Sequence, residues 1–587
     1  MKLAARGYLL IGAAAAIAIP AIAQVRNTAA PPETQVPAQD TVPPATQPSP
    51  QPQAAPAQTE GGEVVEVDEQ ELTTEPPPPP VEYPDHARRD PFTAGALDPV
   101  QLGLRTQPWG DASGVFLSAL MRQMDTPLAS RWAHIALRNA LLSSTRSPRG
   151  VNPVDWAAER AWLLLRMGEA DAGRLIVGGV DTDRFTPKMV QVAVQSALAN
   201  SDPLGLCPVG EDLRQAEPGI FPLVQAMCSA LNGEPESAAA QIDSARRRGR
   251  VGGIDLALAQ KVVGAASDSS RAVTIEWEPV EALTTWRYGL ATATATTPPG
   301  RLLDNASPQL RAWYARAPLI PFQDRLQSAR IATGLGVFSS QALTDFYSWI
   351  YDSTDPNELG GTDAWQLRLA FAGRSQEQRL AAMRRLWLGD DPVQREASRA
   401  LLGRAAARIV PDPELEADAP DLIASMLAAG MDKEAARWAD AIGGMDDEYA
   451  DRAWAMLALG APEGAVDTSA SRVNAFIGRD ESRGRKRSAL LVAGLAALGR
   501  LDIGAASRLN SRHRLHIERG SPWTQMVDAA ARRRQPGSVL VLAGTGLQAP
   551  DWNSVPSSHL FHIVMALRNT GQDFSSRMIA AEALART

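Results

Sequence analysis

One turn pattern recurs six times along this 587-residue chain, and it constrains the fold more than any other feature. Each copy has a glycine, a carboxylate two or three positions later, and a small residue five positions after the glycine. The glycines are Gly168, Gly233, Gly430, Gly460, Gly499 and Gly571. Glycine can adopt the left-handed conformation that ends a helix, an acid suits the next helix N-terminus, and a small residue lets two helices approach. The pattern therefore predicts helical hairpins.

The other two positions of the pattern are equally regular. The carboxylates are Asp171, Glu236, Asp432, Glu463, Asp502 and Asp573, and the small residues are Gly173, Ala238, Ala435, Ala465, Gly504 and Ser576. Residues 421–442 (DLIASMLAAGMDKEAARWADAI) show the unit most completely, with apolar residues at helical spacing on both sides of Gly430. Asp432 is expected to cap the second helix of this copy.

This spacing resembles the tetratricopeptide-like hairpin, whose turn glycine is followed five residues later by an alanine. The aromatic residue which that family usually carries two positions after the glycine is missing here. The copies are also unevenly spaced: 430 to 460 is 30 residues and 460 to 499 is 39, whereas a regular array repeats every 34 or so. The resemblance implies an all-α fold, an irregular α-solenoid of such hairpins. A generic alanine-rich helical bundle is the alternative.

The first residues are typical of a secretory signal peptide. Basic Lys2 and Arg6 precede an apolar run at 8–19, and Ala21-Ile22-Ala23 forms an A-x-A cleavage site. We therefore expect cleavage after Ala23 and a periplasmic or secreted protein, with an uncleaved anchor as the alternative. No later run is apolar over the roughly 18 residues that a membrane span needs, so the mature chain is expected to have no transmembrane segment.

Composition divides the rest of the chain in two. Residues 24–91 are rich in Pro and Gln and include an acidic block at 60–71, which predicts a disordered linker; the acidic block could also bind a basic partner. Residues 92–587 show helical periodicity and are expected to form the α-helical repeat domain. Possible sub-borders lie at the Pro- and Gly-containing breaks 296–300, 352–361 and 411–420.

Net charge argues against one class of partner. The formal charge of -8 opposes nucleic-acid binding as the main task. Basic clusters nevertheless stand at 246–250, 483–487 and 532–534, and each could meet an anionic glycan or a lipid headgroup. The preferred interpretation is structural, because at least two of the clusters are expected at helix C-termini, where positive charge complements the helix dipole.

Familiar catalytic and metal-binding motifs do not occur. The sequence has no G-x-S-x-G, no H-E-x-x-H and no Walker glycine loop, so no catalytic residue and no cofactor are predicted. Two H-x-x-H pairs, His513 with His516 and His559 with His562, supply too few ligands for zinc, and no metal site is expected.

Periplasmic helical solenoids also occur in soluble lytic transglycosylases, whose separate catalytic domain carries a Glu-Ser pair. The chain carries such a dipeptide at Glu481-Ser482, but it is followed by RGRKRS instead of an apolar helix. A catalytic glutamate needs apolar surroundings that raise its pKa, and these basic neighbours would lower it. The sequence therefore resembles the solenoid part of those enzymes and not their catalytic domain.

Cys207 and Cys228 are the only cysteines. In an exported protein they predict a disulfide, which would attach an irregular Pro- and Gly-containing loop to a helix; two buried free thiols are the alternative.

A partner site is the last expectation. Aromatic residues concentrate between 277 and 387, several of them beside arginines. Such groups suit sugar rings or the anchor side chains of a protein partner, although they can equally fill a core. We expect Trp286, Arg287, Tyr288, Trp313 and Tyr314 to include exposed groove residues.

Together these features predict an exported, noncatalytic scaffold or binding protein of the cell envelope that holds a protein or a glycan. The alternative is a periplasmic enzyme that acts on peptidoglycan or another polysaccharide through an unrecognised active site.

Overall fold

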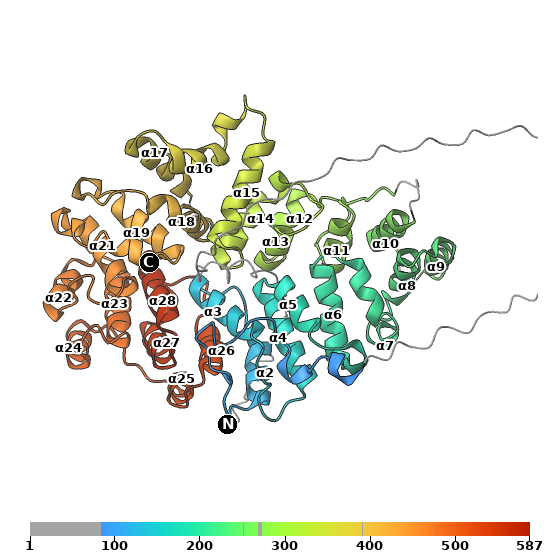
Figure 1. Cartoon of the computed structure of the whole chain (residues 1–587), viewed down its shortest axis with the longest axis horizontal. Helices are drawn as coiled ribbons and strands as arrows, with labels where there is room; N and C mark the ends of the chain where they lie inside the picture. The colour runs from blue at the N-terminus through green and yellow to red at the C-terminus, as the bar shows by residue number, and fades with distance from the viewer. Residues whose placement is uncertain (1–83, 250–251, 268–272, 390) are drawn as a thin grey trace, which may run out of the picture. The chain divides into compact units, whose positions relative to one another are not determined.

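The computed structural model describes residues 84–249, 252–267, 273–389 and 391–587. The predicted signal peptide and most of the predicted linker, including its acidic block, lie outside these residues. Arg89–Thr587 pack as one unit. Every regular element in the described residues is a helix, and the β-contacts are two isolated bridges. The all-α prediction is confirmed for this part of the chain (Figure 1).

The helices follow one another with short connections. The first are α2 (Gly114–Gln123), α3 (Arg131–Leu142), α4 (Pro153–Met167), α5 (Ala170–Val177), α6 (Pro187–Ala199), α7 (Leu213–Ala216), α8 (Phe221–Leu231), α9 (Pro235–Arg247) and α10 (Gly253–Ala266). The next are α11 (Thr285–Ala293), α12 (Gly300–Asp304), α13 (Pro308–Tyr314), α14 (Phe322–Leu335), α15 (Ser340–Ser353), α16 (Asp363–Ala372), α17 (Gln376–Trp387) and α18 (Pro392–Ala406). The three predicted breaks overlap the connections α11–α12, α15–α16 and α18–α19.

The last helices are α19 (Ala419–Ala428), α20 (Asp432–Ala436), α21 (Asp447–Gly460), α22 (Ala470–Arg479), α23 (Lys486–Ala497), α24 (Ile503–His513), α25 (Pro522–Arg532), α26 (Pro536–Gly546), α27 (Ser557–Asn569) and α28 (Asp573–Ala585). Short 3-10 helices are η1 (Asp85–Ala87), η2 (Pro91–Thr93), η3 (Thr182–Arg184), η4 (Pro203–Val209), η5 (Leu359–Gly361), η6 (Pro413–Leu415), η7 (Ala441–Gly444) and η8 (Arg483–Arg485).

Many helices begin where a short polar side chain caps them. The side chain accepts a hydrogen bond from a first-turn backbone N–H at Ser113, Ser130, Asn152, Thr186, Thr284, Ser307, Ser339, Thr362, Ser375, Asp391, Ser469, Asp502 and Ser521. Proline follows at several of these sites, because the first turn has no helical partner for the N–H that proline lacks.

Five of the six predicted hairpin turns are present. Their glycines have positive φ: Gly168 (116°), Gly233 (85°), Gly430 (77°), Gly499 (71°) and Gly571 (86°). Each stands between consecutive helices, namely α4–α5, α8–α9, α19–α20, α23–α24 and α27–α28. Glycine adopts this left-handed conformation without the steric penalty that a Cβ brings, which is why it ends the first helix of each pair.

The turn predicted at Gly460 is wrong. Helix α21 continues through Gly460 and no helix begins before Ala470, so Ala465 lies in the connection. A Cβ at Gly460 would stand 2.9 Å from Ala581 Cβ and from Leu427 Cδ2. Glycine is needed here for close packing of α21 against α28 and α19, and not for a left-handed turn.

The small residues of the pattern pack as expected in most copies. A Cβ at Gly173 would stand 3.0 Å from Leu165 Cγ, so α5 lies tightly on α4. Ala238, Ala435 and Ser576 are fully buried. The acid has a different role from the predicted one in the copy at Gly430. Asp432 is the first residue of α20, makes no cap, and instead accepts a hydrogen bond of 2.8 Å from Arg577 Nη1 of α28.

The N-terminal and C-terminal helices pack together, which the repeat pattern did not predict. Helix α3 contacts α26, α28 and α14 as well as its neighbours α4 and α5 (Figure 1). Arg131 connects α3 to α28, α14 and α19: its backbone N–H donates to Glu582 Oε1 (2.8 Å), its Nε to the Thr333 carbonyl (2.8 Å) and its Nη1 to the Ala428 carbonyl (2.7 Å).

Glu582 of α28 closes this arrangement. Its carboxylate accepts hydrogen bonds from the backbone N–H of Arg131 and Trp132 and from the Ser130 hydroxyl, all at the N-terminus of α3, and from Arg586 Nη1. An anion at a helix N-terminus is favourable, since it meets unpaired N–H groups and the positive end of the dipole. The last helix therefore caps a helix that lies about 450 residues earlier.

A second buried polar cluster lies one helical turn further along α3. His134 Nε2 stands 3.0 Å from Glu169 Oε1, and Arg138 Nη1 donates to the same oxygen at 3.5 Å. Burial lowers the pKa of His134 to about 3 and raises the pKa of Glu169 to about 8. The imidazole is therefore neutral at physiological pH, and this cluster attaches α3 to the start of α5.

Candidate functional site

The four aromatic residues predicted to line a groove are buried. The exposed fraction is 8% for Trp286, 1% for Trp313 and 0% for Tyr288 and Tyr314. The rings of Tyr288 and Trp313 stack with centroids 5.3 Å apart. The expectation that these residues are exposed is wrong, and they belong to the core between α11, α13 and the helices around them.

The guanidinium group of Arg287 is engaged within the chain. Arg287 forms a bidentate pair with Asp255, at 2.9 Å for both hydrogen bonds. Burial raises the pKa of Tyr314 to about 12, so its hydroxyl stays protonated. The rings fill a part of the fold where α11, α12 and α13 are short, and alanine and leucine alone would leave voids there.

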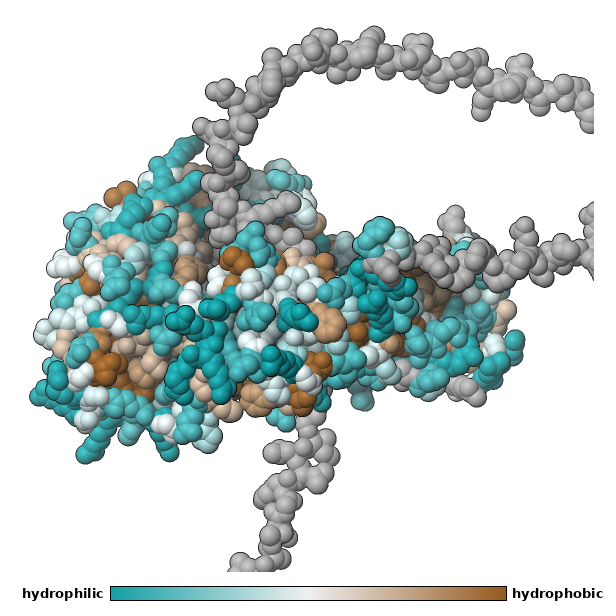
Figure 2. Space-filling model, turned by 60° about the horizontal axis from the view of Figure 1, so that its bottom comes forward, coloured by the Kyte–Doolittle hydropathy of each residue, from teal (hydrophilic) through white to brown (hydrophobic). Residues whose placement is uncertain are grey.

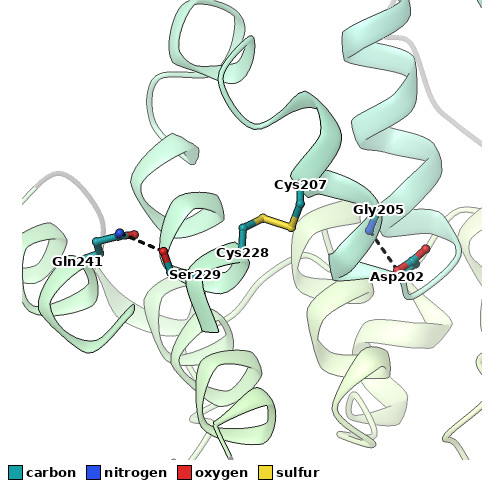
Figure 3. Close-up of a disulfide and its surroundings, with 6 residues drawn as sticks. All are labelled: Asp202, Gly205, Cys207, Cys228, Ser229 and Gln241. Carbon is teal, nitrogen blue, oxygen red and sulfur yellow. Dashed lines mark hydrogen bonds between the residues drawn. A yellow bond between two sulfur atoms is a disulfide. The ribbon is translucent and has the colours of Figure 1, made fainter. Parts of the chain in front are cut away.

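The disulfide prediction is confirmed. Cys207 of η4 is bonded to Cys228 of α8, with Cα atoms 5.6 Å apart (Figure 3). Asp202 caps η4 by accepting from the Gly205 N–H, and on the other side Gln241 of α9 donates to Ser229. The bond therefore attaches the irregular 203–209 segment to the α8–α9 hairpin.

Replacing both cysteines with serine should destabilise the protein by about 3 kcal/mol, because the bond closes a loop of 21 residues in the unfolded chain. Urea unfolding of the oxidised protein measures this change. The single Cys207→Ser variant should give the same loss, since either change removes the bond. Alkylation of two thiols in unreduced wild-type protein would contradict the prediction.

A cavity of about 480 Å³ lies among the C-terminal helices, where the sequence indicated no site. Its walls come from one face of α21, the end of α22 with the segment after it, the first turn of α23, and the end of α28, with single residues from α18 and α19. The lining residues are Arg399, Pro420, Asp447, Glu448, Asp451, Arg452, Ala455, Met456, Phe476, Arg479, Asp480, Glu481, Arg487, Leu584, Ala585 and Thr587.

Asp451 organises the charges on one wall. Its carboxylate accepts hydrogen bonds from Arg472 Nη2 (2.7 Å), Arg479 Nε (2.7 Å) and Arg479 Nη2 (2.9 Å). Burial alone would raise the pKa of Asp451, but the hydrogen bonds from the two arginines outweigh it and hold that pKa below its ordinary value. Asp447 pairs with the same Arg479 at 3.3 Å.

Asp480 accepts hydrogen bonds at the start of α23. It accepts from the Ser482 N–H (2.9 Å), the Ser488 N–H (2.8 Å) and the Ser488 hydroxyl (2.5 Å). Burial alone would raise the pKa of Asp480, and these hydrogen bonds lower it instead. Both Asp451 and Asp480 are therefore held as anions.

Other charged groups at the cavity have no such partners. Glu448, Glu481 and Arg452 are exposed at its edge and form no ion pair within the described residues. Arg399 is nine-tenths buried and donates through both Nη atoms, to the Ala585 carbonyl and to Asp421, but its buried Nε has no acceptor. The cavity thus offers positive and negative groups that the fold does not use.

The two histidines of the second H-x-x-H pair, His559 and His562, make different contacts. His562 Nδ1 binds Asp528 (2.8 Å), whereas His559 Nδ1 binds the Gly546 carbonyl and its ring lies against Trp523. In the part of the chain that the structure describes, no three His, Cys, Asp or Glu side chains come together in a way that could hold a metal ion. None of the described helices combines the length and the apolar composition needed to cross a membrane.

Comparison with protein-family models, with curated protein sequences and with solved structures gives no match.

Proposed function

We propose that this chain is an exported, noncatalytic binding protein of the cell envelope, which holds a protein or glycan partner at the charged cavity beside α21. We also propose that its hairpins form an irregular α-solenoid of tetratricopeptide-like units. Sequential packing of α4 with α5, α8 with α9, α18 with α19 and α27 with α28 supports that arrangement.

The observation that carries the proposal is a set of charged groups at the cavity that have no partner within the described residues. Glu448, Glu481, Arg452 and the Nε of Arg399 are available, while the neighbouring arginines and aspartates satisfy one another. Of these groups the buried Nε of Arg399 is the unusual one, because buried polar groups are normally hydrogen-bonded, and it lies at a cavity whose edge carries the exposed charges. A cavity of about 480 Å³ is within the range, roughly 300–1,000 Å³, that ligand sites occupy.

The electrostatics favour binding over acid–base chemistry. A glycosidase needs a carboxylic acid whose pKa is raised so that it can donate a proton near neutral pH. Two carboxylates at this cavity, buried Asp451 and half-buried Asp480, have lowered pKa values. Both stay deprotonated and are engaged within the chain, so neither suits the role of a proton donor.

Photocrosslinking in intact envelopes tests this function. A photoreactive residue in place of Arg452, at the cavity edge, should give a discrete adduct with an envelope protein or glycan. The same residue in place of Arg374, an exposed arginine outside the cavity, should not. The Glu481→Ala change should reduce the adduct from position 452 severalfold, with unchanged melting temperature.

Two outcomes would contradict the proposal. Identical adducts from positions 452 and 374 would mean that the cavity is not a specific site. Degradation of purified peptidoglycan by the wild type, and its loss in the Glu481→Gln variant, would instead favour the enzyme alternative.

A further inference from the structure

The three basic clusters noted in the sequence do not all lie at helix C-termini. Arg246 and Arg247 lie in the last turn of α9, and Arg532 ends α25. At both places positive charge complements the negative end of the helix dipole, as expected. The 483–487 cluster is different, because it immediately precedes α23 and contributes its first two residues. Positive charge there opposes the helix dipole, so the helix-end explanation fails for this cluster.

A second group of arginines meets this cluster in space. Arg485 Nη1 stands 3.0 Å from His513 Nδ1 at the end of α24, and His513 is followed by Arg514 and preceded by Arg512. His513 is further held by Asn474 of α22, 3.2 Å from its Nε2. Burial lowers the pKa of His513, and so do the nearby charges of Arg485 and Arg512. The imidazole therefore joins the two groups of arginines as a neutral bridge.

These arginines are exposed and have no carboxylate partners within the described residues. Arg483, Arg485, Arg512 and Arg514 all face solvent, and none forms an ion pair there. Two nearby acids are engaged elsewhere, since Asp480 accepts from Ser488 and Glu518 accepts from the Ser507 hydroxyl, while the exposed Glu481 forms no ion pair with these arginines. Four adjacent unpaired guanidinium groups on a chain with net charge -8 form a local positive field.

The backbone at this place is unusual as well. Arg485, Arg514 and His516 have φ values of 53°, 57° and 57°, in the left-handed region that residues with a Cβ rarely adopt. Such conformations persist where the surrounding structure imposes them, and they are concentrated at binding sites. Here Arg485 precedes α23 and Arg514 ends α24, the two helix ends that the contact between Arg485 and His513 joins.

We propose that Arg483, Arg485, Arg512 and Arg514 form a binding surface for an anionic polysaccharide of the envelope. Guanidinium groups bind carboxylates and phosphates through paired hydrogen bonds, which suits a chain of repeated anionic groups. A membrane surface fits less well, since interfacial binding also needs apolar side chains that insert. The nearest exposed large hydrophobic side chain along α24 is Ile503, at the opposite end of that helix. The face shown in Figure 2 is mostly hydrophilic, with hydrophobic residues gathered in a few places.

Fluorescence anisotropy with a labelled oligogalacturonide tests this surface on the full-length mature protein. Replacing Arg485, Arg512 and Arg514 with glutamine should weaken binding by about tenfold or more at low salt, and should reduce the slope of log Kd against log salt by about 2. The matched control replaces Arg246, Arg247 and Arg248, which are equally exposed, with glutamine. It removes the same charge and should change Kd by less than about twofold.

Lysine at the same three positions provides a further check that preserves charge. It should keep the salt slope and lose only part of the affinity, because the paired hydrogen bonds are lost. This variant also serves if the glutamine variant does not fold.

Equal losses in the glutamine variant and its control, or no binding by the wild type at low salt, would overturn the proposal. Stronger binding of phosphatidylglycerol vesicles than of oligogalacturonide through the same arginines would assign the surface to membranes instead. None of these outcomes involves the cavity residue Arg452, so they do not depend on the proposed function.

Discussion

Replacing Glu582 with alanine should destabilise the protein by about 3–5 kcal/mol, the loss expected when one member of a buried charged network is removed. The carboxylate accepts from two backbone N–H groups, a hydroxyl and Arg586, and the alanine variant leaves all four donors without it. Glu582→Gln should cost less, because its amide oxygen can still accept from some of these donors.

Hydrogen exchange distinguishes a local effect from general destabilisation. The amides of Arg131 and Trp132 should exchange much faster in Glu582→Ala, since their acceptor is gone, whereas amides in the α8–α9 hairpin should change little. The control Glu414→Ala removes an exposed glutamate and should shift stability by less than about 0.5 kcal/mol. Equal stability of the Glu582 and Glu414 variants would show that the closing contact contributes nothing.

The sequence predicted the hairpins because their causes are local. A glycine with positive φ, an acid near the helix start and a small residue in the contact all act within about ten residues of each other, so they leave a repeated pattern. The failure at Gly460 has the same origin. A glycine required by close packing against Ala581 and Leu427 looks identical in sequence to a glycine required by a left-handed turn.

The closure between α3 and α28 could not be predicted this way. Glu582 follows Ala580 and Ala581 in the second half of α28, and nothing nearby indicates that its partners lie at Ser130 and Arg131. The same limitation applies to the cavity. Its walls come from six helices, and the one local signal that could have indicated it is the i, i+1, i+4, i+5 spacing of Asp447, Glu448, Asp451 and Arg452, which puts charged groups on one face of a helix.

The contact between α28 and α3 also positions part of the cavity wall. The last turn of α28 supplies Leu584 and Ala585 to its wall, and the Ala585 carbonyl accepts from Arg399 at 2.8 Å. Glu582 fixes that turn against α3 only two residues earlier. A change at Glu582 should therefore reduce crosslinking from position 452 as well as stability, whereas Glu481→Ala should reduce crosslinking alone.

Trp313→Ala should destabilise the protein by about 3–5 kcal/mol, as removal of a large buried aromatic side chain does. Its ring is buried and stacks on Tyr288, so the change leaves a void that neighbouring helices cannot fill without moving. Trp349 is the matched control from the same aromatic-rich region, because its side chain is 55% exposed and packs at the surface on Phe322. Trp349→Ala should change stability by about 1 kcal/mol or less.

Urea unfolding followed by circular dichroism measures both variants, and photocrosslinking from position 452 measures the consequence for binding. Adduct formed by Trp313→Ala should fall only in proportion to the folded fraction, since a core residue supports the fold and does not touch the partner. If Trp313→Ala instead kept full stability and lost the adduct, Trp313 would have to be accessible to the partner, and the aromatic region would be the binding site in place of the charged cavity.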